Sequence, residues 1–294
     1  MSRRSELFRA LGALCEIPHP AHAPIARALE LQGPADPSEY TEAFVFQLPP
    51  YASIYLGAEG MLGGEARERI AGFWQAVGFT PPPEPDHLAA LLSLYAALEE
   101  AADREGEPAR RSLRREAKGA LLWEHLLPWA PLYASKMTQQ MAPGHFARWA
   151  ALLSQVLLNE AALFGGHWKL PVHLRSAPPL GDADASLEGL VGALLSPVRS
   201  GLILTRHDLA RAASDTNLGL RMGERRFALK AMLDQDTVAV LGWVVLLARA
   251  WAVRHRKMEG AIGPIAVFWA YRAEATADSV AKMLAKSRRA VPRR

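Results

Sequence analysis

The chain has 294 residues, half of them apolar and 22% charged, with a formal net charge of +4. This composition is typical of a globular protein and excludes a largely disordered chain. The single cysteine, Cys15, excludes a disulfide framework within the chain and a thiolate metal cage, and it indicates a reducing compartment.

The first residues, Ser2-Arg3-Arg4, resemble the start of a twin-arginine export signal. Such a signal needs an uninterrupted apolar stretch of roughly 7–15 residues after its basic region. Glu6 and Arg9 interrupt that stretch here, so we predict a short amphipathic helix instead.

Nor does any segment approach the ~20 consecutive apolar residues of a membrane span. The best candidate, residues 238–248, is short and runs into Arg249. We therefore expect a cytoplasmic protein without membrane insertion.

Apolar residues recur with helical spacing along most of the chain, and no run of strand alternation is present, which predicts an all-α fold. The helices expected after the first one cover residues 65–77, 88–98, 121–141 with a bend or restart at Pro128, 146–163, 187–195, 207–213, 224–233, 237–254 and 264–286. Between them we expect irregular structure at 18–50, an extended entry at 48–56 and an exposed loop at 99–115.

Prolines and glycines accumulate in residues 168–184, which predicts a linker. The predicted division of the chain is therefore a helical core over residues 1–167 and a helical C-terminal extension over residues 185–294.

Sequence signatures of catalysis are missing. The chain contains no phosphate-binding loop, dinucleotide fingerprint, Gly-x-Ser-x-Gly elbow or His-Glu-x-x-His motif. His19 and His22 lie in a proline-rich segment without further ligands near them in sequence, so we interpret them as loop histidines. We predict a protein that binds a partner, with no catalytic residues, cofactor or metal.

Three short strings stand in a fixed order: LPPYASIYL at 48–56, PDHL at 85–88 and WEHLLPW at 123–129. Together they resemble the TorD/DmsD/NarJ family of redox-enzyme maturation chaperones over roughly residues 40–165. The segment before Leu48 is shorter than the family's pattern, and the region after about Leu180 is extra length.

The resemblance implies a helical bundle of the TorD-like type with a hinge near residues 80–87. It also implies a cytoplasmic chaperone that binds the twin-arginine signal peptide, or the N-terminal region, of a molybdenum- or tungsten-cofactor oxidoreductase subunit. That chaperone would assist maturation of the apo catalytic subunit before export or assembly.

Client-binding residues are expected along the same strings. They are Tyr51, Ser53, Tyr55, Glu84, Asp86, His87 and Trp129. Asp86 precedes a clean amphipathic helix, so it is either its N-cap alone or an N-cap that also offers a carboxylate to a basic peptide. The sequence leaves both explanations open.

A different class of function is the alternative. Residues 205–233 have the size and charge of a helix-turn-helix unit, with a turn near Asn217 and with Arg225, Arg226 and Lys230 on the second helix. A DNA-binding regulator is thus the second hypothesis, and an assembly subunit without client release is the third. The expected oligomeric state is a monomer or a dimer that exchanges helical halves.

Overall fold

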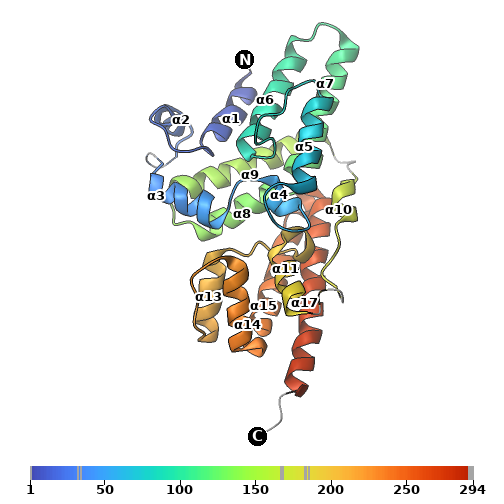
Figure 1. The fold of residues 1–294 in the computed structure, drawn as a ribbon. Coiled ribbons are helices and arrows are strands. Elements are labelled where there is room, and N and C mark those ends of the chain that lie inside the picture. Colours follow the sequence, from blue (N-terminus) through green and yellow to red (C-terminus); the bar gives the residue numbers. More distant parts are fainter. Residues whose placement is uncertain are drawn as a thin grey trace. The chain divides into compact units, whose positions relative to one another are not determined.

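The computed structural model describes residues 2–31, 33, 35–165, 169–181, 184 and 186–290, with side chains up to residue 288. Helices dominate throughout (Figure 1), and the described residues form no strand, so the all-α prediction is confirmed. Within this part of the chain, strand-like pairing occurs as one isolated antiparallel bridge between Tyr51 and His87.

The chain divides into two compact units. Unit 1 comprises Met1–Ile54 and Leu62–Pro171, and unit 2 comprises Tyr55–Met61 and Val172–Arg294. Part of the predicted linker, residues 168, 182 and 183, lies outside the described residues, and its described part contains a short helix, α10 (Val172–Ser176). The predicted domain boundaries therefore stay a prediction.

Unit 1 is built from helices of very different length. They are α1 (Arg3–Ala13), α2 (His22–Ala28), α3 (Pro37–Tyr40), the π-helix η1 (Thr41–Gln47), α4 (Ala52–Leu56, which crosses into unit 2), α5 (Gly64–Ala76), α6 (Leu88–Arg104), α7 (Pro108–Ala120), the π-helix η2 (Leu121–Leu126), α8 (Ala130–Gln140) and α9 (His145–Phe164).

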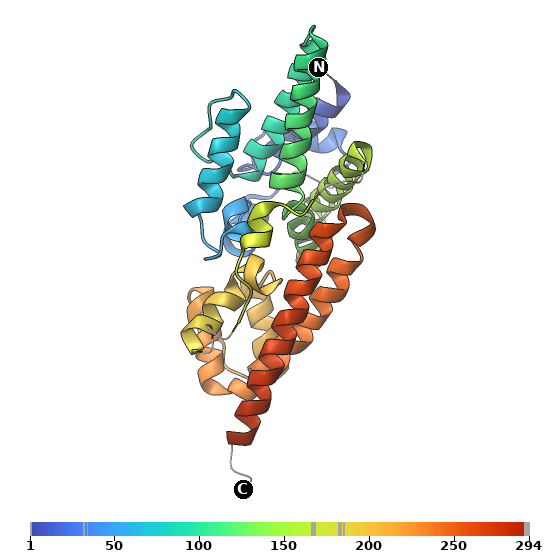
Figure 2. The same ribbon diagram turned by 90° about the vertical axis from the view of Figure 1, so that its right-hand side faces the viewer.

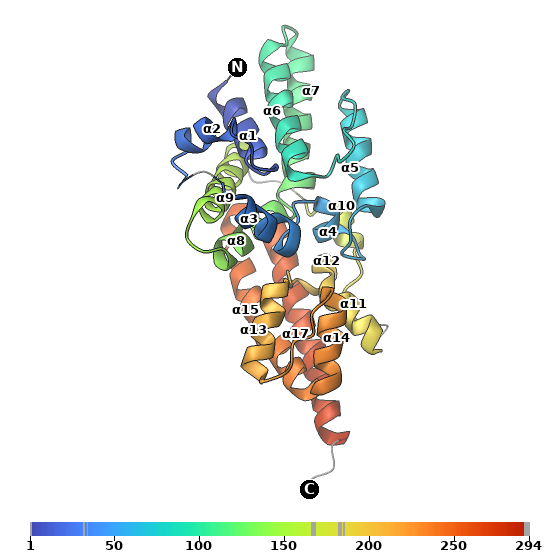
Figure 3. The same ribbon diagram turned by 60° about the vertical axis from the view of Figure 1, so that its left-hand side comes forward.

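The centre of unit 1 is α6, which lies side by side with α7 (Figure 3). Its leucines recur at helical spacing and are buried, as the sequence predicts. Helix α1 packs along α6, with the ring centroids of Phe8 and Tyr95 4.2 Å apart. The indole N–H of Trp149 on α9 donates to the carbonyl of Leu11 at 3.0 Å, which fixes the end of α1.

Both π-helices end two residues before a proline, a feature that the sequence analysis did not predict. Their widened last turns are closed by Leu48 N–H to Ala43 carbonyl and by Leu127 N–H to Leu122 carbonyl, each 2.8 Å long. Since proline has no N–H to continue the helix, the chain leaves the helix at Pro49 and Pro128. The restart expected at Pro128 is confirmed, because α8 begins at Ala130.

Three expectations of irregular structure were wrong. Residues 99–115 are helical on both sides of a short turn, because α6 continues to Arg104 and Pro108 opens α7 at a first-turn position where its missing N–H costs nothing. Residues 18–50 hold α2, α3 and η1. The segment 48–56 is extended only as far as Tyr51 and then becomes α4.

Unit 2 contains the remaining helices. They are α10, α11 (Leu187–Leu195), α12 (Pro197–Ser200), α13 (Arg206–Thr216), α14 (Arg225–Gln235), α15 (Thr237–Arg256), α16 (Glu259–Ile262) and α17 (Pro264–Ala290). Helices α15 and α17 run alongside each other (Figure 2). Gly201, with a φ of 72°, ends α12 where a Cβ would meet the backbone of Ala273 on α17, and its carbonyl lies 2.9 Å from His255 Nε2.

Helix α15 agrees closely with the predicted helix 237–254 and extends beyond the apolar stretch 238–248, through Arg249 to Arg256. By length and composition it is the one helix of the described residues that could cross a membrane. Helices in the core of soluble proteins pass the same test, so this finding decides nothing about a membrane.

Candidate functional site

Two of the three sequence strings meet in space at the start of α6. The N–H of Leu88 donates to the carbonyl of Pro50 at 2.8 Å, and the N–H of Ala52 donates to the carbonyl of Asp86 at 3.0 Å. These bonds flank the bridge between Tyr51 and His87. We call residues 50–53 together with residues 84–88 the junction.

Asp86 holds the junction together from inside. Asp86 is 2% exposed, and its Oδ2 accepts the N–H of Ser53 at 3.1 Å. The backbone carbonyl of Asp86 accepts the N–H of Ala52, the residue before Ser53. Asp86 therefore binds two N–H groups in the first turn of α4, which have no acceptor within the helix. An anionic side chain is also favoured there by the helix dipole.

The expectation that Asp86 is the N-cap of α6 was wrong, because the cap is His87. Its Nδ1 accepts the N–H of Ala89 at 3.2 Å, and its backbone is extended, with φ −65° and ψ 139°. The pairing with Tyr51 holds His87 in that extended conformation, so His87 takes the cap position before Leu88 and the Asp86 carboxylate turns to α4 instead.

The imidazole of His87 is half-buried and lies edge-on to the ring of Tyr51, with centroids 4.8 Å apart. Burial lowers the pKa of His87, although the charges of Glu84, Glu16 and Asp86 oppose the shift. A neutral ring is what the cap requires, because only an unprotonated Nδ1 accepts a hydrogen bond.

Tyr51 and Glu84 form the outer face of the junction. The hydroxyl of Tyr51 donates to Glu84 Oε2 at 3.0 Å, where Tyr51 is half-buried and Glu84 is exposed. Burial and the bond to Glu84 raise the pKa of Tyr51 well above its ordinary value. This face therefore offers an aromatic ring beside an exposed carboxylate, a pairing suited to an arginine side chain.

The proline-rich connector before the junction is anchored on α5. Trp74 Nε1 donates to the carbonyl of Pro85 at 3.2 Å, and Arg67 Nη2 donates to the carbonyl of Pro83 at 3.0 Å. The predicted hinge at residues 80–87 stays a prediction, and these two bonds are what any hinge motion must break.

Four of the predicted client-binding residues lie in the interior: Asp86 and three others. Ser53 is fully buried and its Oγ accepts the N–H of Gly63 at 3.2 Å. Trp129 is fully buried, and its Nε1 donates to the carbonyl of His125 at 2.9 Å. Tyr55 is 2% exposed and belongs to unit 2. Contact of these buried residues with a client stays a prediction. Of the seven predicted residues, Tyr51, Glu84 and His87 are the ones that a client could reach from the surface in this conformation.

Glu99, Glu100 and Asp103 of the same helix do not add negative potential beside Asp86. They lie near the other end of α6, about 18 Å along the helix axis at 1.5 Å per residue. Glu99 and Glu100 are paired there with cations, Glu99 with Lys118 and Glu100 with Arg9.

Among the described residues, no group of three or more His, Cys, Asp or Glu side chains could hold a metal ion. Cys15 is fully buried, and burial raises the pKa of its thiol. A thiol in that state is a packing group rather than a nucleophile.

The helix-turn-helix alternative does not fit the geometry of unit 2. Eight residues, 217–224, separate α13 from α14, whereas the motif joins its helices with a turn of about 3–4 residues. The basic side chains of α14 are also bound within the unit. Arg225 donates to the carbonyl of Leu204 at 2.6 Å, while Arg226 and Lys230 both pair with Glu188.

Comparison with known proteins concerns the part of the chain that contains the junction. Residues 22–135 match the family described as nitrate reductase delta subunit. The chaperone protein TorD of Vibrio cholerae serotype O1 is 34% identical over 107 residues, which cover 35% of this chain and 48% of that protein. The same protein from another strain of the serotype is 33% identical over the same shares.

The chain therefore resembles this family and TorD chaperones over part of its length, and we call residues 22–135, which match the family, the TorD-like region. This chain spans about half the length of the curated relatives that it matches. The TorD-like region includes all three sequence strings and so contains the whole junction, whereas α1, the end of α8, all of α9 and nearly all of unit 2 lie outside it.

Proposed function

We propose that this protein is a maturation chaperone for a redox enzyme. It binds the twin-arginine signal peptide, or the N-terminal region, of a molybdenum- or tungsten-cofactor oxidoreductase subunit in the cytoplasm. It holds the apo catalytic subunit until its cofactor is loaded, and then permits export or assembly. The protein itself is not an enzyme.

One observation carries this proposal: the part of the chain that resembles proteins named as chaperones is the part that builds the junction. Its two buried anchors, Asp86 and Ser53, fix the backbone, and its outer face presents Tyr51, Glu84 and His87. A rigid base with an aromatic and anionic face is suited to bind a basic peptide.

The apolar stretch of a leader would need an apolar surface close to this face. Helix η1 leads directly into Pro49 and leaves Val45 56% and Phe46 48% exposed. A leader whose arginine meets Glu84 can therefore place apolar residues on η1. The π-helical turn, a feature frequent at functional sites, supports this assignment.

Calorimetric titration tests the proposal. The titrant is the leader peptide of an oxidoreductase encoded next to this protein, and the variants are Glu84→Gln and Tyr51→Phe. Glu84→Gln should weaken binding about five-fold, since it removes the exposed carboxylate, whereas Tyr51→Phe keeps the aromatic ring and should change the affinity less than about two-fold. The matched control is Glu68→Gln, an exposed carboxylate on α5, and it should bind like the wild type. If no leader or apo subunit binds the wild type, the proposed function is wrong.

A further inference from the structure

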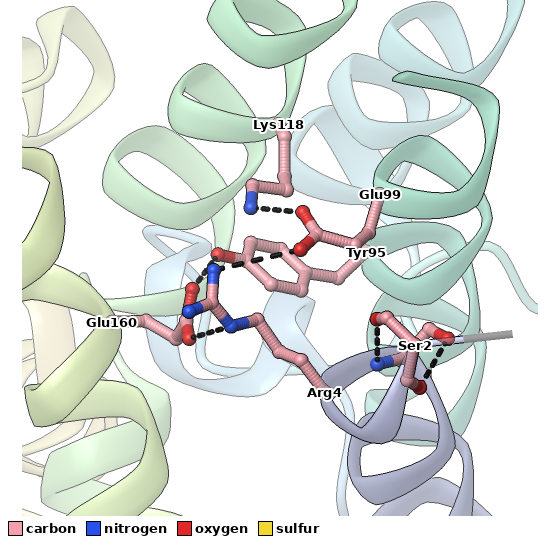
Figure 4. A network of polar contacts seen from close by, with 7 residues as sticks. Ser2, Arg4, Tyr95, Glu99, Lys118 and Glu160 are labelled. Atoms are coloured by element: carbon pink, nitrogen blue, oxygen red, sulfur yellow. Dashed lines mark hydrogen bonds and ion pairs between the residues drawn. The ribbon is translucent and has the colours of Figure 1, made fainter. Parts of the chain in front are cut away.

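The first helix of the chain places one arginine on two carboxylates near the C-terminal end of α6. Arg4 Nε lies 3.1 Å from Glu160 Oε1, and Arg4 Nη1 lies 3.5 Å from Glu99 Oε1 (Figure 4). The guanidinium thus joins α6 to α9 in unit 1, at the opposite end of α6 from the junction.

The two carboxylates are held by the fold, whereas the arginine reaches them from solvent. The side chains of Glu160 and Glu99 are 6% and 14% exposed, and that of Arg4 is 43% exposed. The hydroxyl of Tyr95 donates to Glu160 Oε2 at 2.6 Å, and Lys118 pairs with Glu99. Among the described residues Arg4 is the cation within ion-pair distance of Glu160, so a guanidinium that leaves must be replaced if the buried carboxylate is to keep a direct partner.

A cavity of about 250 Å³ adjoins this ion pair, and its lining also includes Asp103, the cations Arg115 and Lys118, Leu163 and Phe164. The cavity is smaller than the roughly 300–1,000 Å³ of sites for small-molecule ligands, but it admits a side chain. Leu163 at its rim is 65% exposed, so an apolar residue next to an inserted arginine would find an apolar contact.

Within α1, the side chain of Arg4 is the part that can move while the helix stays in place. Phe8 and Leu11 of the same helix are fully buried, so α1 itself is fixed on α6. Arg4 lies in the first turn, which Ser2 caps by accepting the N–H of Ser5 at 3.1 Å. The guanidinium can therefore swing into solvent while α1 stays in place.

We propose that the Glu99–Glu160 pair is a guanidinium site for an arginine of the client's leader, and that Arg4 occupies it until the leader arrives. The inference rests on the proposed function and adds a second contact and a built-in competitor to it. Ser2-Arg3-Arg4, which resembles the basic start of a leader but lacks its uninterrupted apolar stretch, presents an arginine to this site.

Fluorescence anisotropy with a labelled peptide tests the inference. The peptide carries an Arg-Arg pair followed by about a dozen leucines and alanines, the length of an apolar leader region. Arg4→Ala should bind it up to about five-fold more tightly, because the occupant is held by a partly exposed ion pair. Glu160→Gln should bind it at least about five-fold more weakly, since it removes the buried acceptor.

Arg9→Ala is the matched control. Arg9 lies on the same helix and pairs with Glu100 at 2.9 Å, without touching Glu99 or Glu160, so its variant should bind like the wild type. A peptide with Lys-Lys should lose the gain seen with Arg4→Ala, because an ammonium cannot bridge two carboxylates as a guanidinium does. Circular dichroism checks that each variant is folded, and Glu99→Gln replaces Glu160→Gln if the latter is not.

The outcomes separate the two proposals. Binding of the peptide with the same affinity by wild type, Arg4→Ala and the glutamate variants overturns this inference and leaves the proposed function standing. If no variant binds the peptide or a client leader, the proposed function is wrong, and the inference falls with it.

Discussion

Replacing Asp86 with alanine tests how the junction is built. The substitution removes the buried carboxylate that accepts the N–H of Ser53 at 3.1 Å and leaves that donor without a partner. A hydrogen bond to a charged group contributes roughly 1.5–3 kcal/mol, and an unsatisfied buried donor costs about as much. We therefore expect the free energy of unfolding of unit 1 to fall by about 2–3 kcal/mol.

Asp86→Asn should cost about 1 kcal/mol, since the amide keeps an acceptor oxygen but loses the charge. Urea denaturation gives the free energies, and hydrogen exchange of residues 52–56 reports on the first turn of α4 directly. Glu84→Gln is the matched control. It changes an exposed carboxylate two residues away and should alter the free energy of unfolding by less than about 0.5 kcal/mol.

A loss below about 0.5 kcal/mol in Asp86→Ala, with unchanged exchange at residues 52–56, would refute the structural role of the carboxylate. Weakened leader binding without any loss of stability would then favour the other explanation, in which Asp86 contacts the client directly.

Further predictions concern both units. Burial lowers the pKa of His125 to about 3 and that of His255 to about 4, while the unfolded chain takes up the proton near pH 6.5, so stability is lost as the pH falls below 6.5. Each histidine should cost about 2 kcal/mol between pH 7 and pH 5; urea denaturation at both pH values measures this, and an unchanged free energy would contradict it. Gly201→Ala should destabilise unit 2 by about 2–3 kcal/mol, because φ is 72° and the Cβ meets the α17 backbone; a melting temperature equal to that of the wild type would contradict the packing. Trp149→Phe should cost about 1–3 kcal/mol by leaving the carbonyl of Leu11 unpaired, which hydrogen exchange at the end of α1 checks; unchanged exchange there would argue against that bond.

Long amphipathic segments were predictable from the sequence because burial repeats with the helical period. The buried leucines of α6 and the apolar stripe of α9 show this directly. The end of α9 at Phe164 was predictable too, because a glycine follows it. Gly165 adopts a φ of 74°, a conformation that favours glycine.

The misplaced cap of α6 has a non-local cause. Local preference favours Asp86 as an N-cap, but the pairing of His87 with Tyr51, a residue 36 positions earlier in the chain, places the cap at His87. Contacts that form on folding also explain why the sequence of α7 was interpreted as a charged loop. Its basic side chains find partners such as Glu105 and Glu107 only once the turn before α7 forms.

Sequence strings placed Tyr51, Glu84, Asp86 and His87 in one site, and the structure brings them together. The Arg4 contact was not predictable, because Glu99 and Glu160 are 61 residues apart and no local pattern links them to the first helix.

Photo-crosslinking tests the central claim most directly. A leader peptide of a molybdenum- or tungsten-cofactor oxidoreductase, with a photoreactive residue beside its arginines, is irradiated with the intact protein, and the attachment sites are read by mass spectrometry. The account predicts cross-links within residues 45–52 and 84–87 of the TorD-like region. Cross-links confined to residues 186–290, or none above those of a scrambled peptide, would contradict it.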